Sequence, residues 1–260
     1  MFSVLQLGHV SRRMIDIEIT QGGNLFMWWP FYWNPTYWLF VAPALLLMLY
    51  AQWRVQTAYA KWGRVPNSRG LPGVKAAEYL LAENNLYGVR IQGIGGQLTD
   101  NYDPRTKTLN LSQGTAMQGS VAALAIVAHE IAHAQQDASG NLLLQLRTGI
   151  VPAVNIGSQL GPILFIIGFF MRFSPLMWLG IAFFSLAFVF ALITLPVEID
   201  ASSKAMRMLT NSGLLVGDSE RRGARAVLSA AALTYVAGLL MALFQLLYYV
   251  VLAGSGRRRH

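Results

Sequence analysis

The run HEIAH at positions 129–133 holds the residues best suited to chemistry in this chain of 260 residues. Its two histidines, His129 and His133, are four positions apart. On an α-helix they lie one turn apart on one face and can direct both imidazoles at a single ion. Glu130 would then lie beside that ion, where its carboxylate can accept a proton from water that the metal has made more acidic. The spacing therefore predicts a zinc site with His129 and His133 as ligands and Glu130 as general base.

The surroundings of this motif favour a metal site over a chance arrangement. The chain has only four histidines, so a chance H-E-x-x-H would occur on the order of 10⁻³ times per chain. The preceding run VAALAIVA is small and apolar, and Ala132 and Ala134 leave space around the imidazoles. We therefore expect a buried helix over residues 120–136 that presents its end to a cleft.

A catalytic zinc site uses three protein ligands and keeps one position open. The chain has no cysteine, and its other histidines, His9 and His260, lie at the termini. The third ligand is therefore expected to be a carboxylate, and the downstream candidates are Asp137, Glu198, Asp200, Asp218 and Glu220. Asp137 would approach the ion awkwardly from the same helix, and the last two acids suit the cap of the final apolar helix.

Glu198 and Asp200 remain, in the run LPVEIDASSKAMRML. Pro196 can open a helical turn there, and acids in a first turn could serve only to offset the helix dipole. Their position in the chain does not decide between this role and that of a metal ligand. Two histidines without a thiolate need an acid, which favours a ligand role, and either acid could fill it.

The composition indicates that a membrane surrounds much of the chain. Hydrophobic residues make up 54% and charged residues 12%, whereas a soluble domain carries about a quarter charged residues. The formal net charge is +8, but the basic residues flank apolar runs, where they suit anionic lipid headgroups. The chain shows no basic and aromatic nucleic-acid motif. We expect a lipid bilayer as partner and no nucleic acid.

The apolar runs predict four membrane helices, each near the roughly 20 residues that a bilayer requires. The expected order is an N-terminal segment 1–37 with interfacial aromatics, a membrane helix 38–53, a catalytic domain 54–150, a helical hairpin 151–195, a segment 196–226 carrying the third ligand, a membrane helix 227–253 and a basic tail 254–260. Four crossings place the catalytic domain and segment 196–226 on the same side of the membrane.

Shorter elements are expected inside the catalytic domain. The spacing of apolar residues over 72–85 predicts an amphipathic helix, and residues 87–92 and 106–111 are typical of strands. Asp103 and Pro104 mark a turn between these strands. The strand 106–111 is expected to be an exposed edge to which an extended peptide substrate could add.

Basic residues near the ends of the apolar runs bear on the orientation of the chain. The catalytic side carries Arg54, Lys61, Arg64, Arg147, Lys204, Arg207, Arg221, Arg222 and Arg225. The opposite side carries Arg12, Arg13, Arg172 and the triple arginine 257–259. The positive-inside rule therefore favours a cytoplasmic catalytic face, and we expect an integral protein of a bacterial inner membrane.

Four ordered stretches, residues 98–112, 127–136, 196–202 and 223–240, make the chain resemble the YugP-type neutral zinc metallopeptidases, which are membrane-embedded bacterial proteins. A more distant likeness is to the HtpX-type membrane proteases. The resemblance covers most of the chain. It implies an α-rich integral membrane protein with about four transmembrane helices and a zincin-like (gluzincin) α+β domain on one membrane face. It also implies that Glu198, rather than Asp200, is the third ligand.

The chain departs from these families at two positions. Ser202 stands where the E-x-x-A-D signature of HtpX-type enzymes has its acid, so Asp200 is expected to hold a ligand imidazole instead. Asn101 stands where the YugP-type family usually has histidine. Side-chain candidates for contacts with ligands or substrate are therefore Asn101, Tyr102, Arg105, Gln136 and Asp200. For Asn101, Tyr102 and Arg105 the alternative is a role in a turn before a strand.

The function expected from these features is that of a membrane-embedded, zinc-dependent endopeptidase with one Zn²⁺ per chain and peptides or membrane proteins as substrates. The alternative is a non-catalytic metal-binding scaffold or adaptor protein of the membrane. Glu130 argues against it, because a structural site has no use for that carboxylate. A transporter is disfavoured because no apolar run contains a central charge.

Overall fold

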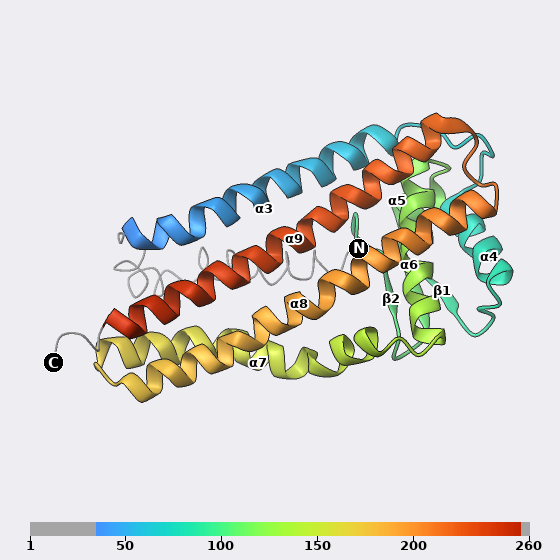
Figure 1. The fold of residues 1–260 in the computed structure, drawn as a ribbon. Helices are drawn as coiled ribbons and strands as arrows, with labels where there is room; N and C mark the ends of the chain where they lie inside the picture. Colours follow the sequence, from blue (N-terminus) through green and yellow to red (C-terminus); the bar gives the residue numbers. More distant parts are fainter. Residues whose placement is uncertain (1–34, 256–260) are drawn as a thin grey trace. The chain divides into compact units, whose positions relative to one another are not determined.

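Four apolar stretches form helices that are long and apolar enough to cross a membrane: α3 (Pro35–Trp62), α7 (Leu142–Phe170), α8 (Ser174–Asn211) and α9 (Gly217–Ser255). Figure 1 shows them in the computed structural model, which describes residues 35–255. The predicted number of membrane helices is confirmed within this range, although the helices extend beyond the predicted apolar runs. The predictions about the aromatic cluster in segment 1–37, the terminal histidines and the C-terminal arginines lie outside the described residues.

Pro196 lies inside α8 and does not open a helix, contrary to the prediction. Proline removes one donor from the helical ladder and crowds the carbonyl one turn before it, yet the residues before and after Pro196 continue one helix. Glu198 and Asp200 therefore lie in the interior of α8. The dipole explanation for these two acids is wrong, because it requires a first turn.

Two compact units make up the described chain. The first unit contains residues 50–142 and 197–234. Its core consists of apolar side chains from α4 (Gly73–Glu83), α6 (Val121–Ala138), the sheet, and the parts of α8 and α9 within this unit. Among them, Leu80, Leu124 and Leu209 are fully buried. The amphipathic pattern over 72–85 thus forms the expected helix.

The sheet of this unit has three strands in the order β1-β3-β2. β1 (Arg90–Ile94) pairs in parallel with β3 (Thr108–Ser112), and β2 (Asn101–Asp103) pairs with β3 in antiparallel register. The expected edge strand over 106–111 is therefore wrong, because β3 is hydrogen-bonded on both sides. Asp103 is the last residue of the short strand β2, which was not predicted because Asp103 and Pro104 are typical of a turn.

The motif helix α6 is almost completely buried in this core. Ser120 caps its first turn, since its hydroxyl accepts a hydrogen bond of 3.1 Å from the backbone N–H of Ala123. The preceding short helix α5 (Gln113–Met117) packs against α6 and was not predicted. A capped, buried helix gives the side chains of the motif a rigid base.

The second unit contains, among described residues, 35–49, 143–196 and 235–255. Its helices α7 and α8 form a hairpin in which the backbones approach closely. A Cβ atom added at Gly161 would lie 2.7 Å from the backbone N of Phe184 and 2.9 Å from the carbonyl oxygen of Gly180. Large apolar side chains such as Leu160, Ile163 and Phe170 are exposed, which suits contact with lipid tails.

We predict that Gly161→Ala destabilises the hairpin by about 1–3 kcal/mol, because both contacts of the new methyl group are with backbone that cannot rotate away. Thermal unfolding of the purified chain in detergent measures the change. Gly149→Ala on the same helix is the control, because nothing lies within 4 Å of a Cβ there. An equal melting temperature for Gly161→Ala and wild type would contradict the close helix packing.

Candidate metal centre

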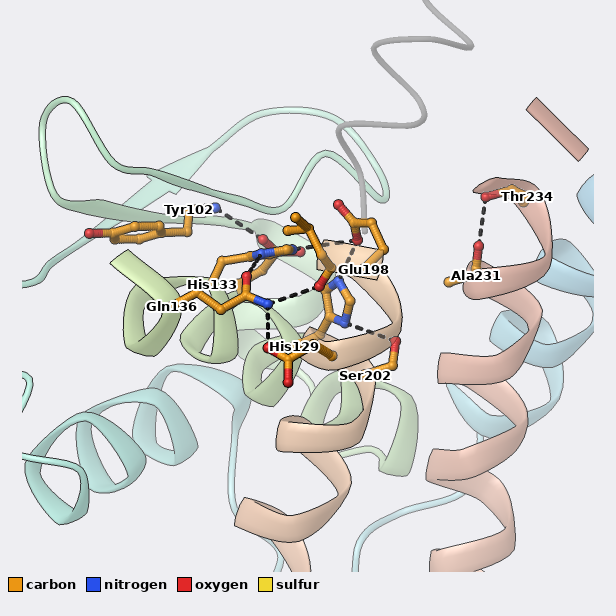
Figure 2. A network of polar contacts seen from close by, with 11 residues as sticks. Tyr102, His129, His133, Gln136, Glu198, Ser202, Ala231 and Thr234 are labelled. Atoms are coloured by element: carbon orange, nitrogen blue, oxygen red, sulfur yellow. Dashed lines mark hydrogen bonds and ion pairs between the residues drawn. The ribbon is translucent and has the colours of Figure 1, made fainter. Parts of the chain in front are cut away.

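Three side chains from α6 and α8 converge on one point. The Nε2 atom of His129 lies 3.1 Å from Oε2 of Glu198, and the Nε2 atom of His133 lies 3.5 Å from the same oxygen. One potential ligand atom from each residue lies within 4.8 Å of the other two. Figure 2 shows the two imidazoles and the carboxylate turned toward one another. The helical spacing of the histidines and the packing of α8 on α6 together produce this cluster.

The chemistry of these donors fits a zinc ion. Two imidazole nitrogens and one carboxylate oxygen form a set of three protein ligands known from catalytic zinc sites. All three side chains are buried, and Glu198 has no exposed surface. Buried charges are paired or coordinate metals, so a divalent cation held by His129, His133 and Glu198 would suit this site.

Burial also sets the charge of one ligand. It lowers the pKa of His129 to about 4, because a charged imidazolium loses its hydration in the core. His129 is therefore neutral near pH 7 and keeps a lone pair for a metal. Its Nδ1 atom lies 3.4 Å from the hydroxyl oxygen of Ser202.

Glu130 points from α6 toward strand β2. Its Oε2 atom accepts a hydrogen bond of 3.0 Å from the backbone N–H of Tyr102, and its side chain is 1% exposed. The hydroxyl of Tyr102 donates a hydrogen bond of 2.7 Å to Asp137, two turns further along α6. Two bonds therefore attach β2 to the motif helix and fix the direction of the Glu130 carboxylate.

The two acids of α8 occupy different surroundings. They are two residues apart and so point about 200° apart around the helix axis. Glu198 faces the histidines, while Asp200 accepts hydrogen bonds of 2.8 Å from Gln136 and 2.5 Å from Lys204. The structure thus brings Asp200 to an imidazole only through Gln136, whose Oε1 atom lies 2.9 Å from Nδ1 of His133.

Ser202 was doubtful from the sequence because it replaces an acid. It follows Glu198 by four residues and so lies on the same face of α8, which brings its hydroxyl to His129. This spacing was the signal that could have identified Ser202 as a neighbour of a ligand.

The remaining sequence candidates lie away from the three ligand atoms. Asn101 bonds to the segment before β2 and to β3, because its side-chain amide donates to the carbonyl of Thr99 at 3.1 Å and accepts from Asn110 at 2.8 Å. Arg105 is exposed in the turn between β2 and β3. The Tyr102 hydroxyl is engaged by Asp137. Asn101 and Arg105 thus lie in the sheet and its turn, whereas the Tyr102 side chain joins the sheet to α6.

Asp100 is a buried acid that the sequence did not single out. Its carboxylate accepts a hydrogen bond of 2.7 Å from the backbone N–H of Ser112 and bonds of 3.0 Å from the hydroxyls of Ser112 and Thr115. Burial raises the pKa of Asp100 above its usual value despite these bonds. Asp100 ties the start of β2 to the end of β3, and so supports the strand that holds Glu130.

Comparisons with known proteins identify a family of zinc peptidases. A family model described as "Putative neutral zinc metallopeptidase" matches residues 37–254. The protein named "Putative membrane protease YugP" from Bacillus subtilis (strain 168) is 40% identical over 214 residues, which cover 82% of this chain and 95% of that protein. No solved structure shows significant similarity to the chain.

We predict that zinc stabilises the wild type through Glu198. A ligand at about 100 times its Kd adds about 2.7 kcal/mol to the free energy of unfolding, and Glu198→Ala should lose most of this gain. Thermal unfolding with and without zinc measures it. Glu78→Ala is the control, since that carboxylate is half exposed on α4. A zinc-induced shift in Glu198→Ala equal to that of the wild type would exclude Glu198 as a ligand.

Proposed function

This chain belongs to the family described as neutral zinc metallopeptidases, and we propose that it is a membrane-embedded endopeptidase that uses one zinc ion. The observation that carries the proposal is the buried convergence of His129, His133 and Glu198 beside Glu130. Two histidines from one helix and a glutamate from a later helix correspond to a gluzincin arrangement. The family description supports a zinc peptidase, and the name of the relative supports a membrane protease.

In the proposed hydrolysis, Glu130 transfers one proton from the attacking water to the leaving amine. Zinc, when bound, polarises a substrate carbonyl and lowers the pKa of water. Glu130 accepts a proton as the water oxygen bonds to the carbonyl carbon. It then returns that proton to the amide nitrogen as the carbon–nitrogen bond breaks. The backbone N–H of Tyr102 keeps the carboxylate turned to the same side throughout.

A non-catalytic metal-binding scaffold is less well supported. Burying a carboxylate is costly, and Glu130 is 1% exposed although it is not among the three converging ligands. A structural zinc site would gain nothing from this second buried acid next to its ligands. A hydrolase requires a base at this position.

We further propose that the substrates are peptides or membrane proteins. Glu198 follows the apolar part of α8 by only a few residues, so the catalytic residues would lie near the lipid headgroups. Of the two edge strands, β2 is the one attached to the motif helix. An extended substrate segment can add to such an edge through main-chain hydrogen bonds.

The catalytic face is proposed to be cytoplasmic in a bacterial inner membrane. Arg54, Arg147 and Arg225 lie close to the ends of apolar runs on the catalytic side, while Arg172 lies in the turn between α7 and α8 on the other side. The excess of arginine on the catalytic side follows the positive-inside rule.

We expect Glu130→Gln to lower kcat by about 10²–10⁴-fold, because the amide cannot accept the proton. Cleavage of a fluorogenic peptide by the purified, zinc-loaded chain measures the loss, and metal analysis should find the zinc content unchanged. Glu83→Gln, an exposed acid at the end of α4, serves as control. Wild-type turnover in Glu130→Gln would refute the proposed base.

The orientation can be tested because the chain has no cysteine of its own. Cysteine at the exposed Lys75 of α4 should react with a membrane-impermeant maleimide only after bacterial cells are permeabilised. Cysteine at the exposed Met171, after α7, should react in intact cells. The reverse pattern would place the catalytic face outside the cytoplasm.

A further inference from the structure

Gln136 occupies the centre of a buried polar network behind His133 and has no exposed surface. Its Oε1 atom lies 2.9 Å from Nδ1 of His133. Its Nε2 atom lies 2.9 Å from the carbonyl oxygen of Val197 and 2.8 Å from Oδ2 of Asp200. Figure 2 shows the amide between the imidazole and α8. One side chain thus joins a ligand on α6 to two groups on the helix that carries Glu198.

The partners of Gln136 determine which way its amide faces. A backbone carbonyl and an ionised carboxylate only accept hydrogen bonds, so both must receive hydrogens from the amide nitrogen. Lys204, at 2.5 Å from Oδ2 of Asp200, favours the ionised form of that acid. A flipped amide would place oxygen against both acceptors, which is unfavourable. The amide oxygen therefore faces His133.

The direction of the amide in turn selects the form of His133. An amide oxygen can only accept a hydrogen bond, so the Nδ1 atom of His133 must carry the hydrogen. A neutral imidazole has one hydrogen, and Nε2 then holds a free lone pair. This is the nitrogen that lies 3.5 Å from Oε2 of Glu198, among the converging ligand atoms.

We propose that Gln136 is a positioning residue that locks His133 in the Nδ1-protonated tautomer, so that Nε2 is ready to bind the metal before any metal arrives. This inference deepens the proposed function and rests on it for the identity of the metal. Lys204 and Asp200 act through Gln136, because they hold its amide nitrogen away from the imidazole.

Among the described residues, the group that contacts Nδ1 of the other histidine ligand has no fixed hydrogen-bond direction. The polar group beside Nδ1 of His129 is the hydroxyl of Ser202 at 3.4 Å, and a hydroxyl can donate or accept. Of the two histidines, His133 is the one whose Nδ1 atom faces a group that can only accept a hydrogen bond. The tautomer of His133 is therefore the one that the protein specifies.

The tautomer can be read directly in the full-length, metal-free protein. Histidine labelled with ¹⁵N gives few signals in a chain with four histidines, and a long-range ¹H–¹⁵N spectrum near pH 7 distinguishes Nδ1–H from Nε2–H. The His133→Gln variant identifies the His133 signals. We expect only the Nδ1–H form at His133 in the wild type, and the Nε2–H form there would overturn the proposal.

Two variants separate the lock from simple packing. Gln136→Met keeps the length of the side chain but cannot accept a hydrogen bond, so we expect a mixture of tautomers and a 10–100-fold loss of zinc affinity. The double variant Gln136→Glu with Asp200→Asn keeps the net charge, and the carboxylate introduced at position 136 would still accept from Nδ1 of His133. We expect this double variant to keep the Nδ1–H form.

Gln135→Met is the matched control, because Gln135 lies next in sequence and donates its hydrogen bond to Asn84 at 2.6 Å instead of contacting a ligand. Its tautomer and zinc affinity should equal those of the wild type. The Nδ1–H form alone in a folded Gln136→Met, or a mixture of tautomers in the charge-conserving double variant, would overturn the lock. Should Gln136→Met fail to fold, the tautomer of His133 in the wild type and in the double variant still tests the proposal.

The same spectra distinguish a failure of this inference from a failure of the proposed function. The tautomer is read without metal and without substrate, so it is independent of catalysis. A chain that hydrolyses peptides through Glu130 but shows Nε2–H at His133 refutes the lock alone. A chain that shows Nδ1–H but binds no zinc refutes the proposed function alone.

Discussion

The buried carboxylate of Glu198 between two imidazoles is the constraint on which the rest of the site depends. Removing such a charge from water costs several kcal/mol unless other charges and hydrogen bonds compensate. The imidazole nitrogens of His129 and His133 face it at 3.1 and 3.5 Å. Burial keeps His129 neutral, so this imidazole alone does not balance the carboxylate. A cation held among the three ligand atoms, such as the zinc of this family, would interact favourably with the carboxylate.

To bring Glu198 to the histidines, α8 combines an apolar segment with a polar segment in one continuous helix. Its first part is strongly apolar, and its last part contributes Glu198, Asp200 and Ser202 to the unit that contains the motif helix. The helix continues through Pro196, so the three polar residues keep helical spacing. Glu198 and Ser202 can then face α6 together, while Asp200 is turned aside to bind Gln136 and Lys204.

Hydrogen bonds from neighbouring groups fix the orientation of the side chains of Glu130 and His133. The main-chain N–H of Tyr102 in β2 holds Glu130, and the amide of Gln136 holds His133. Asp100 in turn ties β2 to β3. Buried polar networks that are fully satisfied make a site rigid, because any rearrangement leaves a donor or acceptor without a partner in a medium of low polarity.

The sequence alone determined the features that depend on local spacing. A separation of four residues put His129 and His133 on one helical face, and the lengths of the apolar runs predicted the number of membrane helices. Tertiary structure decided what depends on contacts between distant segments. Spacing alone could not choose between Glu198 and Asp200, and packing across 69 residues of sequence turned the first toward His129. Packing also put β3 in the centre of the sheet and kept α8 helical through Pro196, against the local signals. Local rules describe one segment at a time, whereas the partner of a buried charge is set by which segments pack together.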